Sequence, residues 1–144
     1  MGVFSRWGFP TDRDDYDGRK IDSKRYEISG INHVIDPNEK GMSGLKNQDY
    51  VNEAARSLLK SALIFKPSLM YAASDHSIGL PAAIVSSQLS IPFVYEMRGV
   101  WAYSRAANNP NFEESSKFKL MMRLERQCAK RADKLFVISE ALRQ

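Results

Sequence analysis

The stretch PSLMYAASDHSIGLPAAIVSSQLSIPFVYEMRGVW, residues 67–101, decides the fold. Its apolar run Leu69–Ala73 is short, lacks a helical period and lies between Pro67 and a polar segment, which is typical of a strand buried on both faces. A polar loop over residues 74–79 is expected next. Pro81 then fits the first turn of a helix, where its missing N–H costs no hydrogen bond.

A second short strand is predicted at Phe93–Tyr95. The helix between the two strands has an apolar side formed by Leu80, Ile84 and Leu89. A strand, loop, helix and strand of this length require a parallel crossover. Because ligands bind outside the carboxyl ends of the strands in open parallel sheets, we expect a polar crevice where residues 74–79 meet residues 96–101.

The chain before this unit carries weaker signals. Residues 11–25 are dense in Asp, Arg and Lys and indicate an exposed loop. Residues 26–35 predict either a hairpin around a Ser-Gly pair or one irregular strand. Residues 36–44 contain Pro, Asn and two Gly, which predict turns.

Two long helices are predicted from apolar residues at helical spacing, one from about Asn47 to Phe65 and one from about Glu113 to Arg131. Four basic residues of the second helix cluster on one side: Lys119, Arg123, Arg126 and Lys130. Glu125 falls on the opposite, apolar side. Because a buried carboxylate needs a partner, we expect it to bind a loop backbone or an arginine.

The remaining segments complete the pattern. Residues 102–112 contain Asn-Asn-Pro-Asn and predict a mobile loop, Lys134–Ile138 predicts a last strand, and Ser139 is expected to cap a final helix. Alternating strands and helices with parallel crossovers predict an α/β fold, a Rossmann-like doubly wound parallel sheet.

Several motifs resemble the acceptor-side domain of family 4 retaining glycosyltransferases, which have the two-domain GT-B architecture. IPFVYEMRGVW, residues 91–101, carries most of the likeness. Residues 123–125, 132–133 and 137–143 are similar to the segment that closes that domain, and residues 5–10 to the end of its second strand. The resemblance implies transfer of a sugar from a nucleotide-sugar donor to a hydroxyl acceptor, with retention, and a role in polysaccharide biosynthesis.

The chain also departs from the family's pattern. No first strand with a glycine-rich turn precedes residue 3 and no donor-binding domain follows, so we expect residues 1–144 to form a partial N-terminal, acceptor-side domain that is inactive alone. A second copy or a rearranged strand is expected to fill the missing slot. Ala73 and Ala102 stand where the family often has a histidine and an acidic residue. These departures favour the alternative, a non-catalytic binding or assembly module that retains the fold.

Seven residues at the two strand tips are candidate substrate-binding residues: Ser74, His76, Gly79, Glu96, Arg98, Gly99 and Trp101. Arg98 can pair with a phosphate, or it can stabilise the loops together with Glu96 on the same face. Gly99 allows close backbone approach. Trp101 either stacks on a sugar or packs under the loop, and His76 either reaches the crevice or is a solvated loop histidine. No catalytic residue is assigned.

The composition bounds the partners. Apolar residues make up 43% and charged residues 26% of the chain, as in a soluble globular protein, and the net charge of +4 permits contact with phosphates or an anionic membrane. The single cysteine, Cys128, excludes an intramolecular disulfide and a cysteine-based zinc site, and we expect no metal and no cofactor besides the nucleotide-sugar co-substrate.

The expected partners are the nucleotide-sugar and a glycan or lipid-linked acceptor, with no nucleic acid. No apolar run approaches the roughly 20 residues that span a bilayer. The chain start also lacks the apolar core of a secretion signal. We therefore expect a cytoplasmic protein, with the basic helix side as a candidate contact to the inner face of the membrane.

Overall fold

The computed structural model describes residues 1–11, 13, 15–18, 21, 25–37 and 47–142. The chain forms two compact units, residues 1–67 and residues 68–144, and each contains its own three-stranded sheet. The mixed α/β architecture and the parallel sheet of the second unit confirm the predicted fold class.

The first sheet has the order β1-β3-β2, with strands Gly2–Phe4 (β1), Arg25–Ile28 (β2) and Ile31–Val34 (β3). Strands β2 and β3 are antiparallel, whereas β1 is parallel to β3. Ser29 and Gly30 connect the hairpin with φ values of 53° and 74°, and two successive positive φ values define the turn that matches strand twist. Of the two predictions for residues 26–35, the hairpin is confirmed.

Helix α1 runs over Asn47–Phe65, as predicted. Its buried side is made by Tyr50, Val51, Ala54, Ala55 and Ala62. The ring of Phe65 meets that of Phe4 edge-on, with 5.4 Å between centroids. The helix ends where Lys66 adopts φ of 48° immediately before Pro67, because the residue preceding a proline disfavours the helical region. The described residues of the charged segment 11–25 that precede β2 are exposed or half-buried, and most of the predicted turn at 36–44 lies outside the described residues.

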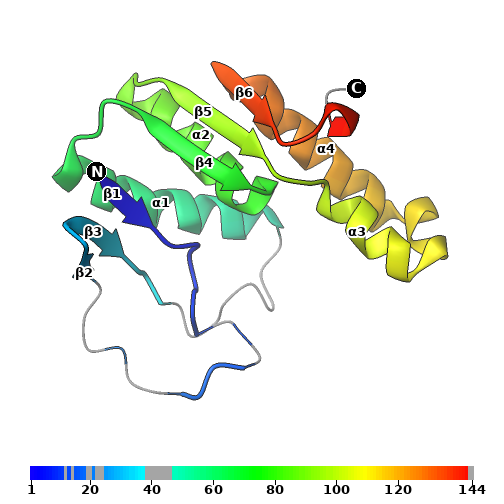
Figure 1. The fold of residues 1–144 in the computed structure, drawn as a ribbon, viewed down its shortest axis with the longest axis horizontal. Coiled ribbons are helices and arrows are strands. Elements are labelled where there is room, and N and C mark those ends of the chain that lie inside the picture. Colours follow the sequence, from blue (N-terminus) through cyan, green and yellow to red (C-terminus); the bar gives the residue numbers. More distant parts are fainter. Residues whose placement is uncertain (12, 14, 19–20, 22–24, 38–46, 143–144) are drawn as a thin grey trace. The chain divides into compact units, whose positions relative to one another are not determined.

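The second sheet is parallel and has the order β4-β5-β6, with strands Met70–Ser74 (β4), Phe93–Met97 (β5) and Lys134–Val137 (β6). Helix α2, His76–Leu89, connects the first two strands, and helices α3, Trp101–Asn108, and α4, Ser116–Arg131, lie between β5 and β6 in the chain. Figure 1 shows the three strands side by side, with α2 and α4 on one face of the sheet.

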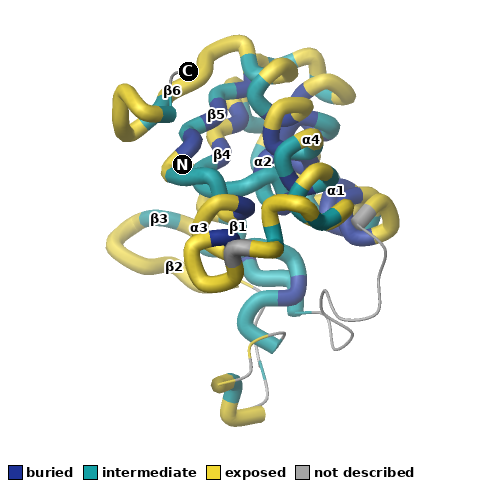
Figure 2. Tube along the Cα trace, turned by 90° about the vertical axis from the view of Figure 1, so that its right-hand side faces the viewer, coloured by how far each residue is buried: buried dark blue, intermediate teal, exposed yellow. Residues whose placement is uncertain are grey.

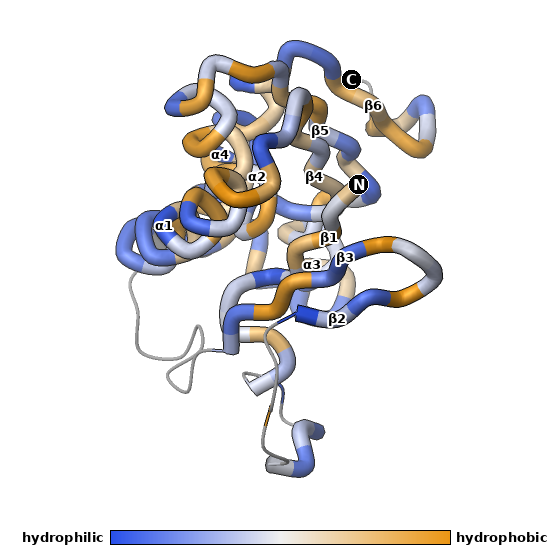
Figure 3. Tube along the Cα trace, turned by 90° about the vertical axis from the view of Figure 1, so that its left-hand side faces the viewer, coloured by the Kyte–Doolittle hydropathy of each residue, from blue (hydrophilic) through white to orange (hydrophobic). Residues whose placement is uncertain are grey.

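The core of this unit lies between the sheet and helices α2 and α4. Phe93 and Tyr95 of β5 point into it with Val85 of α2, and all three are fully buried. The opposite face is open: Tyr71 is 53% exposed and Phe136 is 57% exposed. Strand β6 is mostly yellow in Figure 2 and largely orange in Figure 3. The prediction that the first strand is buried on both faces is therefore wrong, because the helices of this unit cover only one face.

Helix α2 begins earlier than predicted. Residues 76–79 belong to the helix and not to a loop, and Pro81 lies inside the helix and not in its first turn. The reason is the N-cap: the carboxylate of Asp75 accepts a hydrogen bond of 2.9 Å from the backbone N–H of Ser77.

The predicted loop over residues 102–112 is wrong as well. These residues form α3 and a 3-10 helix, Pro110–Glu114 (η1). Ala102 and Ala106, one turn apart, are both buried, so tertiary burial supports a helix that composition alone does not predict.

Two boundaries also shift near the chain's end. Helix α4 begins at Ser116 and not near Glu113, because the hydroxyl of Ser115 caps it by accepting from the N–H of Phe118 at 3.0 Å. After β6, residues 140–142 form a short 3-10 helix (η2), closed by a 3.1 Å bond from the N–H of Leu142 to the carbonyl of Ser139.

Candidate functional site at the strand tips

The carboxyl ends of β4 and β5 lie next to each other. The two strands are parallel neighbours, and Ser74 at the end of β4 is in register with Met97 at the end of β5. The indole Nε1–H of Trp101 donates a 3.3 Å hydrogen bond to the hydroxyl oxygen of Ser74. The neighbouring position of the two strand ends is confirmed, whereas the polar crevice between them stays a prediction. We call this region the strand-tip site.

Three side chains join on the open face of the sheet beside these tips. The carboxylate of Glu96 accepts hydrogen bonds from the hydroxyl of Tyr71 and, at 3.1 Å, from the guanidinium of Arg98. The side chain of Arg98 is 60% exposed, so the ion pair itself contributes only about 0–1 kcal/mol to stability. The guanidinium carries five N–H donors, and this pair uses one of them.

The sequence predictions missed Tyr71, although a signal for it exists. Alternate residues of a strand share a face, and in parallel strands residues in register lie on the same side of the sheet. Ala73 is in register with Glu96, and Tyr71 lies two residues before Ala73. Strand alternation therefore places Tyr71 and Glu96 on one face, and only the pairing register shows that they are neighbours.

Ser74 has an unusual backbone conformation, with φ of 101°. A residue other than glycine held in such a region costs of order 1–3 kcal/mol and persists only where the surroundings enforce it. Its carbonyl accepts a 2.8 Å hydrogen bond from the hydroxyl of Tyr95. The strain is therefore stored at the strand tip.

Trp101 begins α3 and is 51% exposed, so it is not packed beneath a loop. Tyr103, two residues later, is 52% exposed and touches Phe118 with ring centroids 5.3 Å apart. The residue before α3, Val100, provides no side-chain cap. The start of α3 thus presents an aromatic surface beside the strand tips.

His76 is neither a loop residue nor solvated. It is the first residue of α2, its side chain is 13% exposed, and its Nδ1 lies 3.3 Å from a carboxylate oxygen of Glu125. The same oxygen accepts a 3.0 Å hydrogen bond from the backbone N–H of His76. Glu125 therefore has a backbone partner, but this partner is the first residue of a helix and not a loop residue, and the hydroxyl of Tyr95 is another partner.

The amino terminus of α2 is already occupied by carboxylates. The first N–H donates to Glu125, the second donates to the side chain of Asp75, and the next two donate to the Asp75 carbonyl. The end of a helix at this position in a Rossmann-like unit often binds phosphate. Here two acidic side chains take that place, so a phosphate would have to be bound elsewhere.

The two candidate glycines differ. A Cβ atom on Gly79 would lie 2.2 Å from Sγ of Cys128 and 2.9 Å from a ring carbon of Tyr95, so this glycine lets α2 pack closely against α4 and β5. Its predicted place in an exposed loop is wrong. A Cβ on Gly99 would meet nothing within 4 Å. Packing within the described structure therefore does not explain the glycine at position 99.

Burial disables two potentially reactive groups beneath the site. Burial, and then the hydrogen bond to Glu125, raise the pKa of the Tyr95 hydroxyl far above its ordinary range, so it stays a phenol. Burial, and then the negative charge of Glu125, raise the pKa of the Cys128 thiol to about 12. Because the thiolate is the nucleophile, Cys128 is inert at neutral pH.

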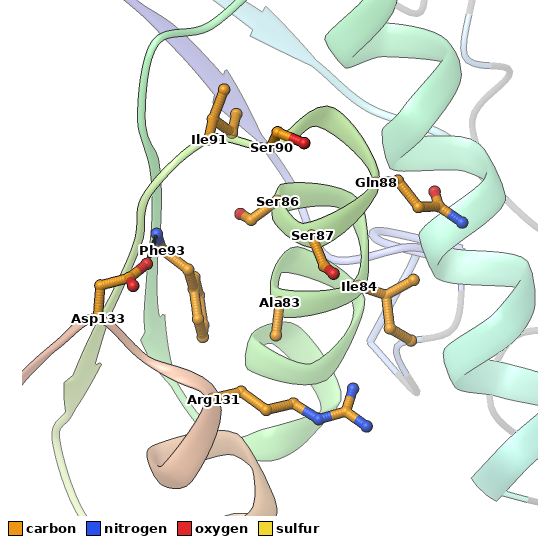
Figure 4. Close-up of a pocket in the computed structure, with 10 residues that line it drawn as sticks. All are labelled: Ala83, Ile84, Ser86, Ser87, Gln88, Ser90, Ile91, Phe93, Arg131 and Asp133. Atoms are coloured by element: carbon orange, nitrogen blue, oxygen red, sulfur yellow. Dashed lines mark hydrogen bonds between the residues drawn. The ribbon is translucent and has the colours of Figure 1, made fainter.

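A pocket of about 540 Å³ lies at the amino ends of strands β5 and β6, opposite to the ends that form the strand-tip site (Figure 4). It is lined by Ala83, Ile84, Ser86, Ser87, Gln88, Ser90, Ile91, Phe93, Arg131 and Asp133. The carboxylate of Asp133 is engaged by the backbone N–H of Phe93 at 2.8 Å. The buried hydroxyl of Ser86 has no hydrogen-bond partner among the described residues. This pocket is separate from the strand-tip site.

The part of the chain that the structure describes holds no cluster of three or more His, Cys, Asp or Glu side chains suited to a metal ion. Among the described helices, none has the length and apolar character required to traverse a bilayer.

A family model supports the lineage that the strand-tip motifs indicate. The model for the glycosyl transferase 4-like domain matches residues 35–144, which is more than half of the chain. The chain therefore belongs to the glycosyl transferase 4-like family, a class of Rossmann-like domains. A comparison with curated proteins gave no match.

Proposed function

We propose that this chain supplies the acceptor-side half of a retaining glycosyltransferase, which moves a sugar from a nucleotide-sugar to a hydroxyl acceptor. One observation carries the proposal: in a chain of this family, Trp101 reaches back to Ser74 and unites the carboxyl ends of two neighbouring parallel strands. That edge is where open α/β sheets bind their ligands.

The chemistry of the strand-tip site suits a saccharide with a phosphate nearby. The carboxylate of Glu96 and the hydroxyl of Ser74 match sugar hydroxyls, and the half-exposed indole of Trp101 offers an apolar surface to a sugar ring. Arg98 keeps exposed N–H donors for a phosphate. Because carboxylates occupy the start of α2, we assign phosphate contact to Arg98 and not to that helix.

In this proposal the donor is held mainly by a second Rossmann-like domain. Stabilisation of the departing diphosphate by positioned donors would supply most of the catalysis. Ala73 provides no imidazole at the position where the family often has one. We therefore propose that the 144-residue chain does not turn over by itself.

The test is a titration of the 144-residue chain, labelled with ¹⁵N, with maltose and with uridine diphosphate glucose as probes. Binding at the strand-tip site shifts the indole N–H resonance of Trp101, while the indole of Trp7 in the first unit serves as the internal reference. Replacing Arg98 with alanine should weaken the response to the nucleotide-sugar by at least about tenfold and preserve the response to maltose. A Trp101 resonance that ignores a broad panel of sugars and nucleotide-sugars would falsify the proposal.

The alternative is a non-catalytic binding or assembly module that keeps the fold. Ala73 and Ala102 favour it, because both replace side chains that the family often uses. Calorimetry separates the two: binding of neither nucleotide-sugars nor glycans supports the alternative, whereas binding of either supports a substrate site.

We further propose a cytoplasmic location at the inner face of the membrane. Four basic residues on one side of α4 are all exposed: Lys119, Arg123, Arg126 and Lys130. Such a face is attracted to anionic lipid headgroups by about 1 kcal/mol for each charge near the surface.

We also propose that the chain forms a dimer through the free edge of strand β4. Strand β4 ends the second sheet and leaves one row of backbone donors and acceptors unpaired within that sheet. Pairing there would give a dimer, and sedimentation of a monomer at all accessible concentrations would contradict it.

A further inference from the structure

A buried network of hydrogen bonds lies directly beneath the strand-tip site. The hydroxyl of Tyr95 is 2.8 Å from the carbonyl oxygen of Ser74 and also donates toward the carboxylate of Glu125. Glu125 in turn holds the first residue of α2 through the N–H of His76. The end of β4, the start of α2 and the middle of α4 thus meet around one phenol.

The phenol cannot be explained as core packing. Tyr95 is fully buried beside Phe93, and a phenylalanine would fill almost the same volume without a polar atom to satisfy. A buried hydroxyl is costly unless it is hydrogen-bonded. Its first acceptor is the carbonyl of Ser74, the residue with the strained φ of 101°.

Ser74 connects this network to the surface. Its carbonyl faces Tyr95 below, and its hydroxyl accepts from the indole of Trp101 above. A change in the peptide orientation of Ser74 would move both groups, since they belong to one residue. The buried phenol is therefore placed to determine where the surface indole is held.

We propose that Tyr95 is a positioning residue of the strand-tip site, with Glu125 as its anchor in α4. The hydroxyl of Tyr95 holds Ser74 in its left-handed conformation, and Ser74 then holds Trp101 over the tips of β4 and β5. The value of this for sugar binding rests on the proposed function. The coupling between the three residues does not, and it can be measured without a ligand.

The anchor has a specific effect on this coupling. The phenol has a single hydrogen and faces two acceptors, the Ser74 carbonyl and the Glu125 carboxylate, which compete for it. In the variant Glu125→Gln the amide can donate to the phenol oxygen, and the phenolic hydrogen is then directed to Ser74 alone. This substitution should tighten the hold on Ser74, whereas Tyr95→Phe should release it.

The experiment follows the indole N–H of Trp101 by ¹⁵N NMR in the ligand-free 144-residue chain. Ser74→Ala removes the acceptor and gives the resonance position of an unheld indole. Tyr95→Phe should move the resonance toward that position and speed indole hydrogen exchange by about fivefold, as expected for loss of a neutral hydrogen bond. Glu125→Gln should slow the exchange. Tyr103→Phe, an exposed hydroxyl near Trp101, is the matched control and should change neither.

The outcomes separate the inferences. A folded Tyr95→Phe protein whose Trp101 resonance and exchange match the parent overturns the positioning role. If Tyr95→Phe does not fold, exchange in Glu125→Gln decides, because unchanged or faster exchange contradicts the competition for the phenolic hydrogen. If the coupling holds but no sugar probe moves Trp101, the proposed function fails and the network stands. If sugars move Trp101 equally in the parent and in Tyr95→Phe, the positioning role alone fails.

Discussion

The two faces of the β4–β5–β6 sheet differ in how far their side chains are buried. On the helix-covered face, Tyr95, Glu125 and Cys128 are buried, and the two polar side chains among them are hydrogen-bonded. On the open face, Tyr71 and Arg98 are exposed around Glu96, and their contacts are individually weak. The covered face therefore carries stability, and the open face is free to bind. Substitutions on the two faces should separate these properties.

The largest effect is expected at Gly79 on the covered face. Its replacement with alanine places a carbon 2.2 Å from the buried Sγ of Cys128, and neither α2 nor α4 can yield without losing packing. We expect a loss of about 3 kcal/mol in the free energy of unfolding, measured by urea denaturation. The matched control, Gly99→Ala, meets open space and should stay within about 0.5 kcal/mol. Equal losses in both variants would erase the contrast between the faces.

The next effect is expected at Glu125. Its replacement with leucine leaves the N–H of His76 without its acceptor and removes one partner of Tyr95. A buried donor without a partner costs about 1–3 kcal/mol, so we expect a loss of about 2 kcal/mol in stability. Glu113→Leu on exposed η1 is the control and should be close to neutral. A leucine variant as stable as the parent would mean that the network adds nothing to the covered face.

Alkaline pH should weaken the covered face selectively. The pKa of Cys128 is about 9 in an unfolded chain and about 12 in the folded one, because burial and Glu125 oppose its ionisation. The unfolded chain therefore releases a proton that the folded chain keeps, and stability falls as pH rises from about 9 to about 12. Cys128→Ala should show a shallower fall, measured by denaturation at several pH values. If the free energy of unfolding fell equally with pH in the parent and in Cys128→Ala, the raised pKa of the buried thiol would be contradicted.

The open face should give the reverse result. Arg98→Ala removes one exposed ion pair, so the free energy of unfolding should change by less than about 0.5 kcal/mol. Binding of uridine diphosphate glucose should weaken by at least about tenfold, since charge-assisted hydrogen bonds to a phosphate are lost. Calorimetry measures the binding. Arg105→Ala on α3, a second exposed arginine, provides the control, and loss of binding there as well would point to general electrostatics.

The smallest effect on stability is expected on the basic side of α4. Replacing Lys119 and Arg126 with glutamate should leave stability almost unchanged, because both side chains are exposed. Sedimentation with vesicles rich in phosphatidylserine should weaken by about fivefold for each charge removed. Retained sedimentation of the double variant would exclude this face as the membrane contact.

The local architecture follows from the sequence to a large extent. Helix α1 was predicted, and the hairpin at Ser29 and Gly30 was one of the two predictions for its segment, because both depend on residues close together in the chain. The parallel crossover from β4 to β5 was also predicted, since a connection long enough to hold a helix is what parallel strands require. Two errors, the starts of α2 and α4, concern the neighbouring caps Asp75 and Ser115, which the predictions overlooked. The error at α3 has another cause, because the burial of its alanines is a property of the tertiary structure.

By itself, the sequence determined the kinds of elements, their order and the two strand tips that meet at one edge, because hydrophobic period, turn residues and loop length are local properties. Only the tertiary structure decided which polar groups lie together inside. Glu125 meets Tyr95 and His76 from 30 and 49 residues away, and the hydroxyl of Tyr95 also bonds to the carbonyl of Ser74. Such contacts depend on how α2 and α4 pack against the sheet, and this packing cannot be predicted from the hydrophobic period or turn residues of one segment.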